Sequence, residues 1–161
     1  MLVNFSCENI LSFKGVVSFS MMASQKKKDN ILTNNFFMAG KEQQEAILET
    51  SLVFGANGSG KTNFIAALAY LKRIVLNQNP ENKFMAPFRL DNDSKNNPSE
   101  LEVEFYAKNN IKYRYGISIF KGEILEEWLY YTPLTRETIL FHREKNLIIE
   151  YNSAGFTEAK D

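Results

Sequence analysis

Residues 55–62 read GANGSGKT, a glycine-rich octapeptide that ends in a lysine and a hydroxyl side chain. The spacing fits the pattern GxxxxGK(S/T), with Gly55, Gly60, Lys61 and Thr62 on its four fixed positions. Glycine tolerates the positive φ values that turn successive backbone N–H groups into one concave loop, and it lets a ligand approach the backbone closely. The pattern therefore predicts a loop that binds a polyphosphate.

Each part of the loop predicts a particular contact with a nucleoside triphosphate. Lys61 is the predicted catalytic residue, because its positive charge can stabilise the β- and γ-phosphates, and the hydroxyl of Thr62 is the predicted Mg²⁺ ligand. A helix after the loop would add its free N-terminal N–H groups and the positive end of its dipole. The predicted nucleotide-binding residues of the loop are Gly55, Ala56, Asn57, Gly58, Ser59, Gly60, Lys61 and Thr62.

Hydrophobic periodicity predicts the elements that position this loop. The apolar run Ser51 to Phe54 predicts a strand before it, and the segment from Asn63 to Leu76 predicts a helix after it. Because Ile65 and Ala69 widen the apolar stripe of that helix, we expect it to lie against a sheet and to be covered on more than one side. The stripe consists of Phe64, Ala67, Leu68, Leu71 and Val75.

Strand patterns flank this unit on both sides. The β-rich runs Leu2 to Cys7 and Val16 to Met22 predict an antiparallel pair at the start of the chain. Over residues 100–151, apolar and polar side chains alternate with a period of two, and short turn-forming breaks interrupt the pattern. This pattern predicts four or five half-buried strands in an antiparallel meander.

The remaining segments are polar. Residues 24–50 predict a long surface loop, either without a strand or with a short one at Asn35 to Ala39, and residues 77–99 predict a second loop. The tail from Ser153 to Asp161 is expected to fray. The predicted fold class is therefore α/β, with one strand–loop–helix unit (51–76) in an otherwise β-rich chain.

Composition limits the class of protein. The 161 residues fit one domain, and 19 basic against 19 acidic residues leave no overall positive field for nucleic acid or an anionic membrane. No segment approaches the ~18 apolar residues that a membrane span needs. Cys7, the single cysteine, predicts a buried free thiol and fits a reducing compartment. We therefore expect a cytoplasmic protein without a membrane partner.

Other residues that could do chemistry have structural explanations. Glu126 and Glu127 look like the acidic pair that ends an ATPase strand, but Gly122 and Glu123 interrupt the apolar run such a pair needs. His142 has no evident nucleophile partner, and Arg114 is expected to pair with a glutamate across the sheet. Asp91 and Asp93 predict a turn, and the aromatic residues predict sheet packing or, alternatively, stacking on an adenine ring: Trp128, Tyr130 and Tyr131.

The sequence favours ATP over GTP and disfavours a small-molecule kinase. A guanine-specific protein would need a base-reading segment of the NKxD type, and none occurs. Small-molecule kinases usually have a parallel sheet with helices between the strands, whereas here an antiparallel meander follows the first helix.

An N-terminal strand pair with Asn9 and Phe13 comes first, followed by an apolar strand, the run FGANGSGKTNF, a helix and an antiparallel meander. This order resembles the first lobe of ABC-type ATPase heads in the SMC, RecF and OLD group. The resemblance covers nearly the whole chain, and its finer motifs look like bacterial ATPases related to OLD proteins and associated with phage defence. It implies a P-loop NTPase fold, ATP with Mg²⁺ on the Walker A residues Gly55 to Thr62, and Asn63 as the residue that opens the helix beside the site. The finer motifs are PFRLD (87–91), PSELEVEF (98–105), YRYG (113–116) and ILEEWLYY (124–131).

Departures from that family pattern limit the expected activity. The sequence holds no LSGGQ-like signature, no strand ending in Asp-Glu and no switch histidine. We therefore expect residues 1–161 to be the N-terminal lobe of a head, able to bind ATP but not to hydrolyse it efficiently alone. The resemblance implies self-association or a partner ATPase segment, with a nuclease partner and DNA for a complete protein. A non-catalytic interaction module, or a P-loop kinase or nucleotide transferase, stays open as an alternative.

Overall fold

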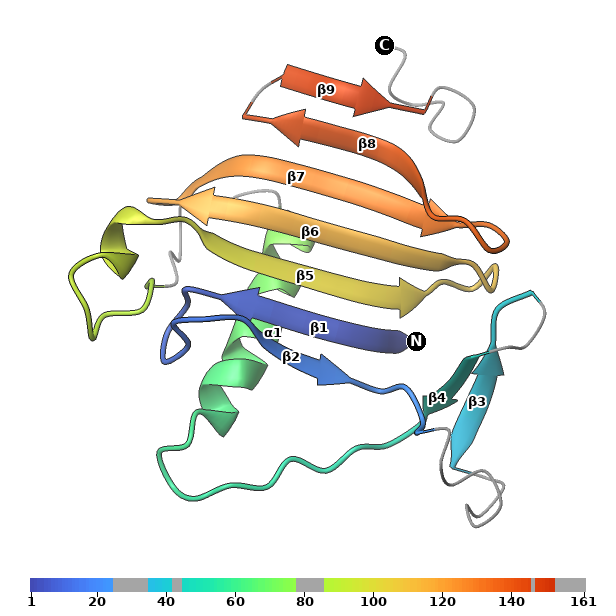
Figure 1. Ribbon diagram of the computed structural model, residues 1–161, viewed down its shortest axis with the longest axis horizontal. Helices are drawn as coiled ribbons and strands as arrows, with labels where there is room; N and C mark the ends of the chain where they lie inside the picture. The colour runs from blue at the N-terminus through green and yellow to red at the C-terminus, as the bar shows by residue number, and fades with distance from the viewer. Residues whose placement is uncertain (25–34, 42–44, 78–85, 146, 153–161) are drawn as a thin grey trace.

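The computed structural model describes residues 1–24, 35–41, 45–77, 86–145 and 147–152. Within them, seven strands form one antiparallel sheet, and the helix α1 (Lys61–Asn77) crosses one of its faces (Figure 1). The strands are β1 (Leu2–Glu8), β2 (Val17–Ser20), β5 (Ser99–Tyr106), β6 (Lys112–Phe120), β7 (Glu123–Thr132), β8 (Thr138–Glu144) and β9 (Leu147–Tyr151). Their order in the sheet is β2-β1-β5-β6-β7-β8-β9.

The antiparallel pair at the start of the chain is confirmed. β1 pairs with β2, where Phe5 lies opposite Phe19, and its other edge pairs with β5, where Phe5 lies opposite Val103. The pairing of β1 with β5 joins strands that are distant in the sequence, whereas the other described neighbours in this sheet follow one another along the chain.

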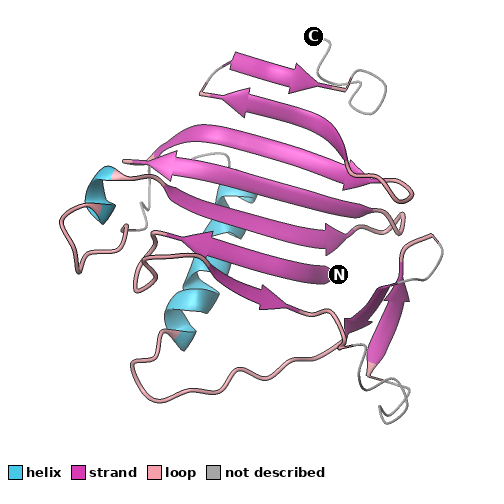
Figure 2. Ribbon diagram, viewed as in Figure 1, coloured by secondary structure: helices cyan, strands magenta, loops and turns pink. Residues whose placement is uncertain are grey.

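The meander is confirmed with five strands, β5 to β9 (Figure 2). Three of the four links between them contain a residue with positive φ, namely Asn110 (57°), Lys121 (50°) and Lys145 (51°). This left-handed conformation lets a short link reverse the chain with the twist that neighbouring antiparallel strands require. The turn signals at these positions therefore predicted the strand boundaries well.

The main core lies between the sheet and α1. Strands β1, β5 and β6 turn alternate residues towards the helix, so Phe5, Leu101 and Ile117 pack with Phe64 and Leu71 of α1. The buried Cys7 belongs to the same cluster, and burial raises the pKa of its thiol to about 11. The buried free thiol predicted for Cys7 is thus confirmed. Among the described residues, no helix is long and apolar enough to cross a membrane.

The predicted covering of the helix on more than one side is wrong within the described residues. Ile65 is 60 % exposed, Ala69 is exposed and Val75 is 50 % exposed, so only the face towards the sheet is buried. In the described part of the chain, α1 lies against the seven-stranded sheet as a second layer, and a helix in a two-layer arrangement buries a single stripe.

The predicted strand from Ser51 to Phe54 is also wrong. The segment is extended but pairs with no described strand, and Leu52 and Phe54 are 74 % and 85 % exposed. A short apolar run becomes a strand only where a neighbouring strand supplies hydrogen-bond partners. In Figure 1 this segment runs apart from the seven-stranded sheet before it enters α1.

A two-stranded sheet, β3 (Phe36–Ala39) and β4 (Glu45–Leu48), packs at the end of the main sheet. β3 confirms the alternative with a short extra strand, but β4 falls in a segment predicted as loop, because four residues carry too little periodicity. Ala39 and Ile47 form a second small core with Val3 and Tyr106. Asn110 ties this hairpin to the β5–β6 turn, since its side chain accepts from Gly40 N (3.1 Å) and donates to Gly40 O (2.9 Å).

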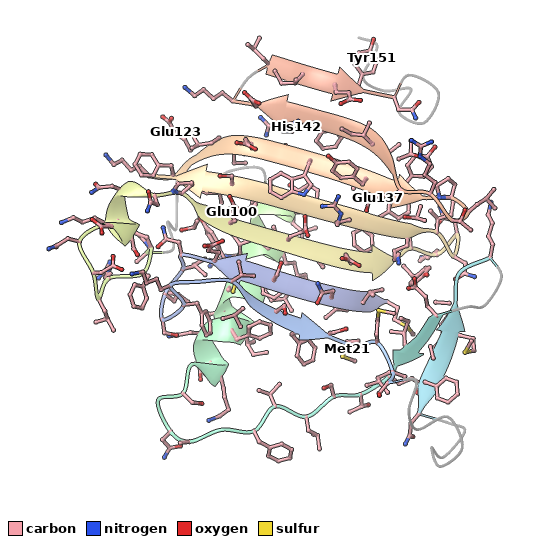
Figure 3. All side chains as sticks on the ribbon, viewed as in Figure 1. Met21, Glu100, Glu123, Glu137, His142 and Tyr151 are labelled. Carbon is pink, nitrogen blue, oxygen red and sulfur yellow. The ribbon has the colours of Figure 1, made fainter. Side chains whose placement is uncertain are left out.

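The sheet face opposite α1 is polar and rich in carboxylates. Figure 3 shows Glu100 and His142 on this face, turned to the viewer, with α1 behind the sheet. Trp128 lies on Gly116 of the neighbouring strand, and its Nε1 donates to Glu102 (2.8 Å). Partial burial of the Glu100 carboxylate raises its pKa, and the negative charges of Glu8, Glu126 and Glu102 raise it further.

We expect Glu100→Gln to stabilise the fold at neutral pH by about 0.5 kcal/mol, the size of a cross-strand charge effect. Because the folded-state pKa of Glu100 is raised, its ionised form is unfavourable in the fold, and this penalty disappears as pH falls through that pKa. Urea unfolding from pH 7 to pH 4 should therefore show a gain that shrinks with acid. The exposed Glu123→Gln is the control, with no gain at either pH. A constant gain across the range would contradict this explanation.

Candidate functional site

The glycine-rich loop joins the extended segment at Gly55 to the first residue of α1, Lys61. Gly58 and Gly60 have positive φ values of 80° and 93°, and Ser59 N donates to Ala56 O (3.2 Å) across the turn. These two glycines occupy conformations that other residues adopt only with strain. The shape of the backbone therefore requires glycine at position 60 of the motif and favours it at position 58.

Close packing adds a second reason for the fixed glycines. A Cβ atom on Gly60 would lie 3.1 Å from both Ser12 Oγ and the ring of Phe13, in the turn between β1 and β2. A Cβ on Gly55 would lie 2.5 Å from Ser59 Oγ across the loop. The loop is thus compact, and its end rests directly on the β1–β2 turn.

Lys61 folds back over the loop. Its Nζ donates to Gly55 O (2.7 Å) and Ala56 O (2.9 Å), so the ammonium group closes the loop from residue 61 to residue 55. Both hydrogen bonds are exposed to solvent, where phosphate oxygens can approach the same ammonium group. The side chain therefore carries positive charge to the place where the loop would receive an anion.

The start of α1 offers further donors to an anion. The first helical hydrogen bond runs from Phe64 N to Gly60 O (2.9 Å), so the N–H groups of Lys61, Thr62 and Asn63 have no acceptor within the helix. The first turn carries no acidic residue, and Thr62 is exposed. The donor set fits a phosphate group, and the free Thr62 hydroxyl beside it suits a cation bound to that phosphate.

A cavity of about 300 Å³ lies beside the loop, between it and the β1–β2 pair. Phe13, Phe19 and Phe54 line it together with Lys61. Phe64 fixes one wall, with ring centroids 6.4 Å from Phe13 and 5.8 Å from Phe19. The lining combines aromatic side chains with Lys61, which suits a planar ring attached to a charged chain.

The acidic pair in β7 does not serve this site. Consecutive strand residues point to opposite faces, and Glu127 lies on the α1 face, where it accepts from Tyr115 Oη (2.6 Å) and from Arg143 Nε. Glu126 lies on the other face, with an oxygen 3.8 Å from His142 Nε2. The sequence predicts solvated strand charges at these two positions, which holds for Glu126, whose side chain is 49 % exposed, and not for Glu127, whose side chain is 16 % exposed.

The other candidates also have structural partners. Arg114 bridges Glu102 (2.8 Å) and Glu137 (2.7 Å), and its guanidinium lies over the ring of Tyr130. Trp128 and Tyr130 therefore pack on the polar sheet face, away from the loop. The cross-strand pairing predicted for Arg114 is confirmed, and so is the sheet packing predicted for these two aromatic residues.

The turn predicted at Asp91 and Asp93 is confirmed. Asp91 Oδ1 accepts from Asp93 N (3.1 Å) and Ser94 N (2.7 Å), and its Oδ2 pairs with Lys14 Nζ (2.7 Å). The hydrogen bond from Lys14, followed by those from Ser94, lowers the pKa of Asp91. Through the Lys14–Asp91 pair, residues 91–94 contact the β1–β2 turn, and no sequence motif predicts this contact.

The sequence did not predict three site residues near the loop, namely Ser12, Phe13 and Phe19. They reach the loop from β1–β2, more than thirty positions earlier in the chain, so only the tertiary structure brings them there. The aromatic character of the strand pair was the single available signal.

The sequence model of one protein family matches residues 51–159, more than half of the chain. That family is described as "AAA domain, putative AbiEii toxin, Type IV TA system". The matched range contains the loop, α1 and strands β5 to β9. No curated protein and no solved structure matches the chain.

Proposed function

Because the chain belongs to the family described as AAA domain, putative AbiEii toxin, Type IV TA system, we propose that residues 55–63 bind ATP with Mg²⁺. Membership of this AAA family supports nucleotide binding in general. The restriction to ATP, and to these residues, is our proposal.

The observation that carries the proposal is the convergence of two kinds of donor, an ammonium group and helix N–H groups, at one glycine-rich loop. The Lys61 ammonium lies over the loop, Gly58 and Gly60 have the positive φ values that shape its backbone, and the first N–H groups of α1 begin at the same point. Lys61 would neutralise the β- and γ-phosphates, and Thr62 would bind Mg²⁺ through its hydroxyl. Bound Mg²⁺ would supply charge compensation between the phosphates.

The cavity beside the loop supports an adenine nucleotide. Phe13 and Phe19 offer apolar surface to a planar base, and Lys61 marks the phosphate end of the same cavity. A base held mainly by apolar contacts needs no guanine-reading carboxylate, in agreement with the absence of an NKxD segment in the sequence. We therefore expect ATP to bind more tightly than GTP.

We further propose that the chain acts as the N-terminal lobe of an ABC-type ATPase head of the SMC, RecF and OLD group, in the cytoplasm. Two apolar surfaces favour a partner unit: the exposed run at Leu52 to Phe54, and a cavity of about 760 Å³ between α1 and the sheet. A second ATPase segment would supply the groups for hydrolysis. Control of DNA transactions, or of a nuclease in phage defence, is the role proposed for the complete assembly.

Calorimetric titration of the folded protein with ATP and GTP, each with Mg²⁺, tests the binding proposal. We expect one ATP site per chain, weaker binding of GTP, and weaker binding of ATP when EDTA removes Mg²⁺. A folded protein that binds neither nucleotide would refute the proposal. Equal affinity for both nucleotides would refute the assignment of the base cavity.

A further inference from the structure

The turn between β1 and β2, residues 9–14, contacts the glycine-rich loop. Ser12 Oγ and the Phe13 ring lie 3.1 Å from the position of a Cβ on Gly60, so any movement of this turn alters the space for the loop. Phe13 also lines the cavity beside Lys61. The turn thus forms part of the wall of the proposed nucleotide site.

The other side of the same turn is tied to residues 86–98 through Asn9. Asn9 is 5 % exposed, and its side-chain amide bonds to four backbone groups of that segment. The Nδ2 group donates to Ser94 O (2.7 Å), Asn97 O (2.9 Å) and Pro98 O (3.0 Å), and Oδ1 accepts from Phe88 N (3.3 Å).

Further bonds join the turn to the same part of the chain. Leu11 N donates to Ala86 O (2.9 Å), Lys14 pairs with Asp91 (2.7 Å), and Ser99 Oγ donates to Asn9 O (2.6 Å). Asn9 and Leu11 both have positive φ values, 48° and 53°. The unusual backbone of the turn is therefore maintained by its partners in residues 86–99 as well as by its own bonds.

We propose that residues 86–98 control the nucleotide affinity of the loop through the β1–β2 turn, and that Asn9 is the positioning residue that couples them. The inference rests on the proposed function. Because Asn9 anchors the segment while Ser12 and Phe13 abut Gly60, displacement of the segment shifts the wall of the site. Coupling of this kind is reciprocal, so bound nucleotide must also restrain residues 86–98.

The decisive variant is Asn9→Ala, which removes four side-chain hydrogen bonds but touches neither the loop nor the cavity. The matched control is Asn110→Ala. Asn110 also has a positive φ, and its side chain also ties a distant hairpin by bonds to backbone groups, but it lies in the β5–β6 turn. Both variants lose bonds that anchor a turn, but only the turn that contains Asn9 contacts the glycine-rich loop.

Titration with ATP-Mg²⁺ should show about a tenfold loss of affinity in Asn9→Ala and less than about a twofold loss in Asn110→Ala. Circular dichroism at the titration temperature establishes that each variant is folded. If Asn9→Ala does not fold, Lys14→Met, which removes only the exposed contact with Asp91, should give a smaller loss in the same direction.

Hydrogen exchange on the wild-type protein tests the reciprocal effect without any variant. ATP-Mg²⁺ should slow exchange of the amides of Phe88 and Ser94 and leave that of Gly40 unchanged. Bound ATP without protection of residues 86–98, or an unchanged affinity in a folded Asn9→Ala, would overturn this inference alone. A folded wild-type protein that does not bind ATP would overturn the proposed function and this inference with it.

Discussion

Lys61→Ala is expected to abolish the stabilisation of the fold by ATP-Mg²⁺. A ligand at about 100 times its dissociation constant adds about 2.7 kcal/mol to the wild-type free energy of unfolding, which corresponds to about 5–10 °C for a chain of this size. Without the ammonium group, the β- and γ-phosphates lose their charged partner, and the loop loses its closure onto Gly55 and Ala56. Thermal unfolding with and without ATP-Mg²⁺ measures the difference.

Lys72→Ala is the matched control for this experiment. Lys72 lies on the same helix and is exposed, but it takes no part in the loop. This variant should keep the full shift in melting temperature. An equal shift in Lys61→Ala and the wild type would mean that the nucleotide binds elsewhere.

Gly116→Ala is expected to cost about 2–3 kcal/mol of stability, although it adds a single methyl group to a strand. The new Cβ would lie 2.3 Å from the ring of Trp128, so the indole must move and give up its hydrogen bond to Glu102. Chemical unfolding monitored by the fluorescence of Trp128, the single tryptophan, reports both the loss of stability and the displaced ring.

A double-mutant cycle separates this clash from the intrinsic cost of alanine. In a Trp128→Ala background the clash is absent, so Gly116→Ala should cost less than about 0.5 kcal/mol there. Gly15→Ala, where a Cβ meets nothing within 4 Å, should be nearly neutral as well. Additive costs of the two substitutions would show that Trp128 does not require the glycine.

The elements with long local patterns were predicted well from the sequence. Alternation over residues 100–151 predicted the meander, and it is clearest at the start of β5, where Ser99 and Leu101 are buried and Glu100 is exposed, whereas β9 is exposed at every position. The helix was equally clear, since Phe64, Ala67 and Leu71 recur on one side of it. Both patterns are repeated often enough within one element to be read without tertiary information.

The errors concern features that depend on neighbours. The run Ser51 to Phe54 is apolar enough for a strand, but a strand also needs a paired edge, which no described strand provides. Ile65 widens the apolar stripe of α1 and was predicted to be covered, but no described element packs on that side of the helix. For the candidate site, the loop residues were recognisable from their spacing, whereas Ser12 and Phe19 were not, because they meet the loop only when α1 packs against the β1–β2 pair.

The order of the strands has a consequence for folding kinetics. Hairpins β5 to β9 close over short distances along the chain and can form early, but pairing of β1 with β5 closes a loop of roughly ninety to a hundred positions, which carries a larger entropic cost. The bonds from Asn9 and Leu11 that anchor the β1–β2 turn to residues 86–98 also close long loops, so the anchored turn beside Gly60 forms late as well. We infer that the site is assembled last, so that a folding intermediate with a complete meander is still unable to recognise phosphate.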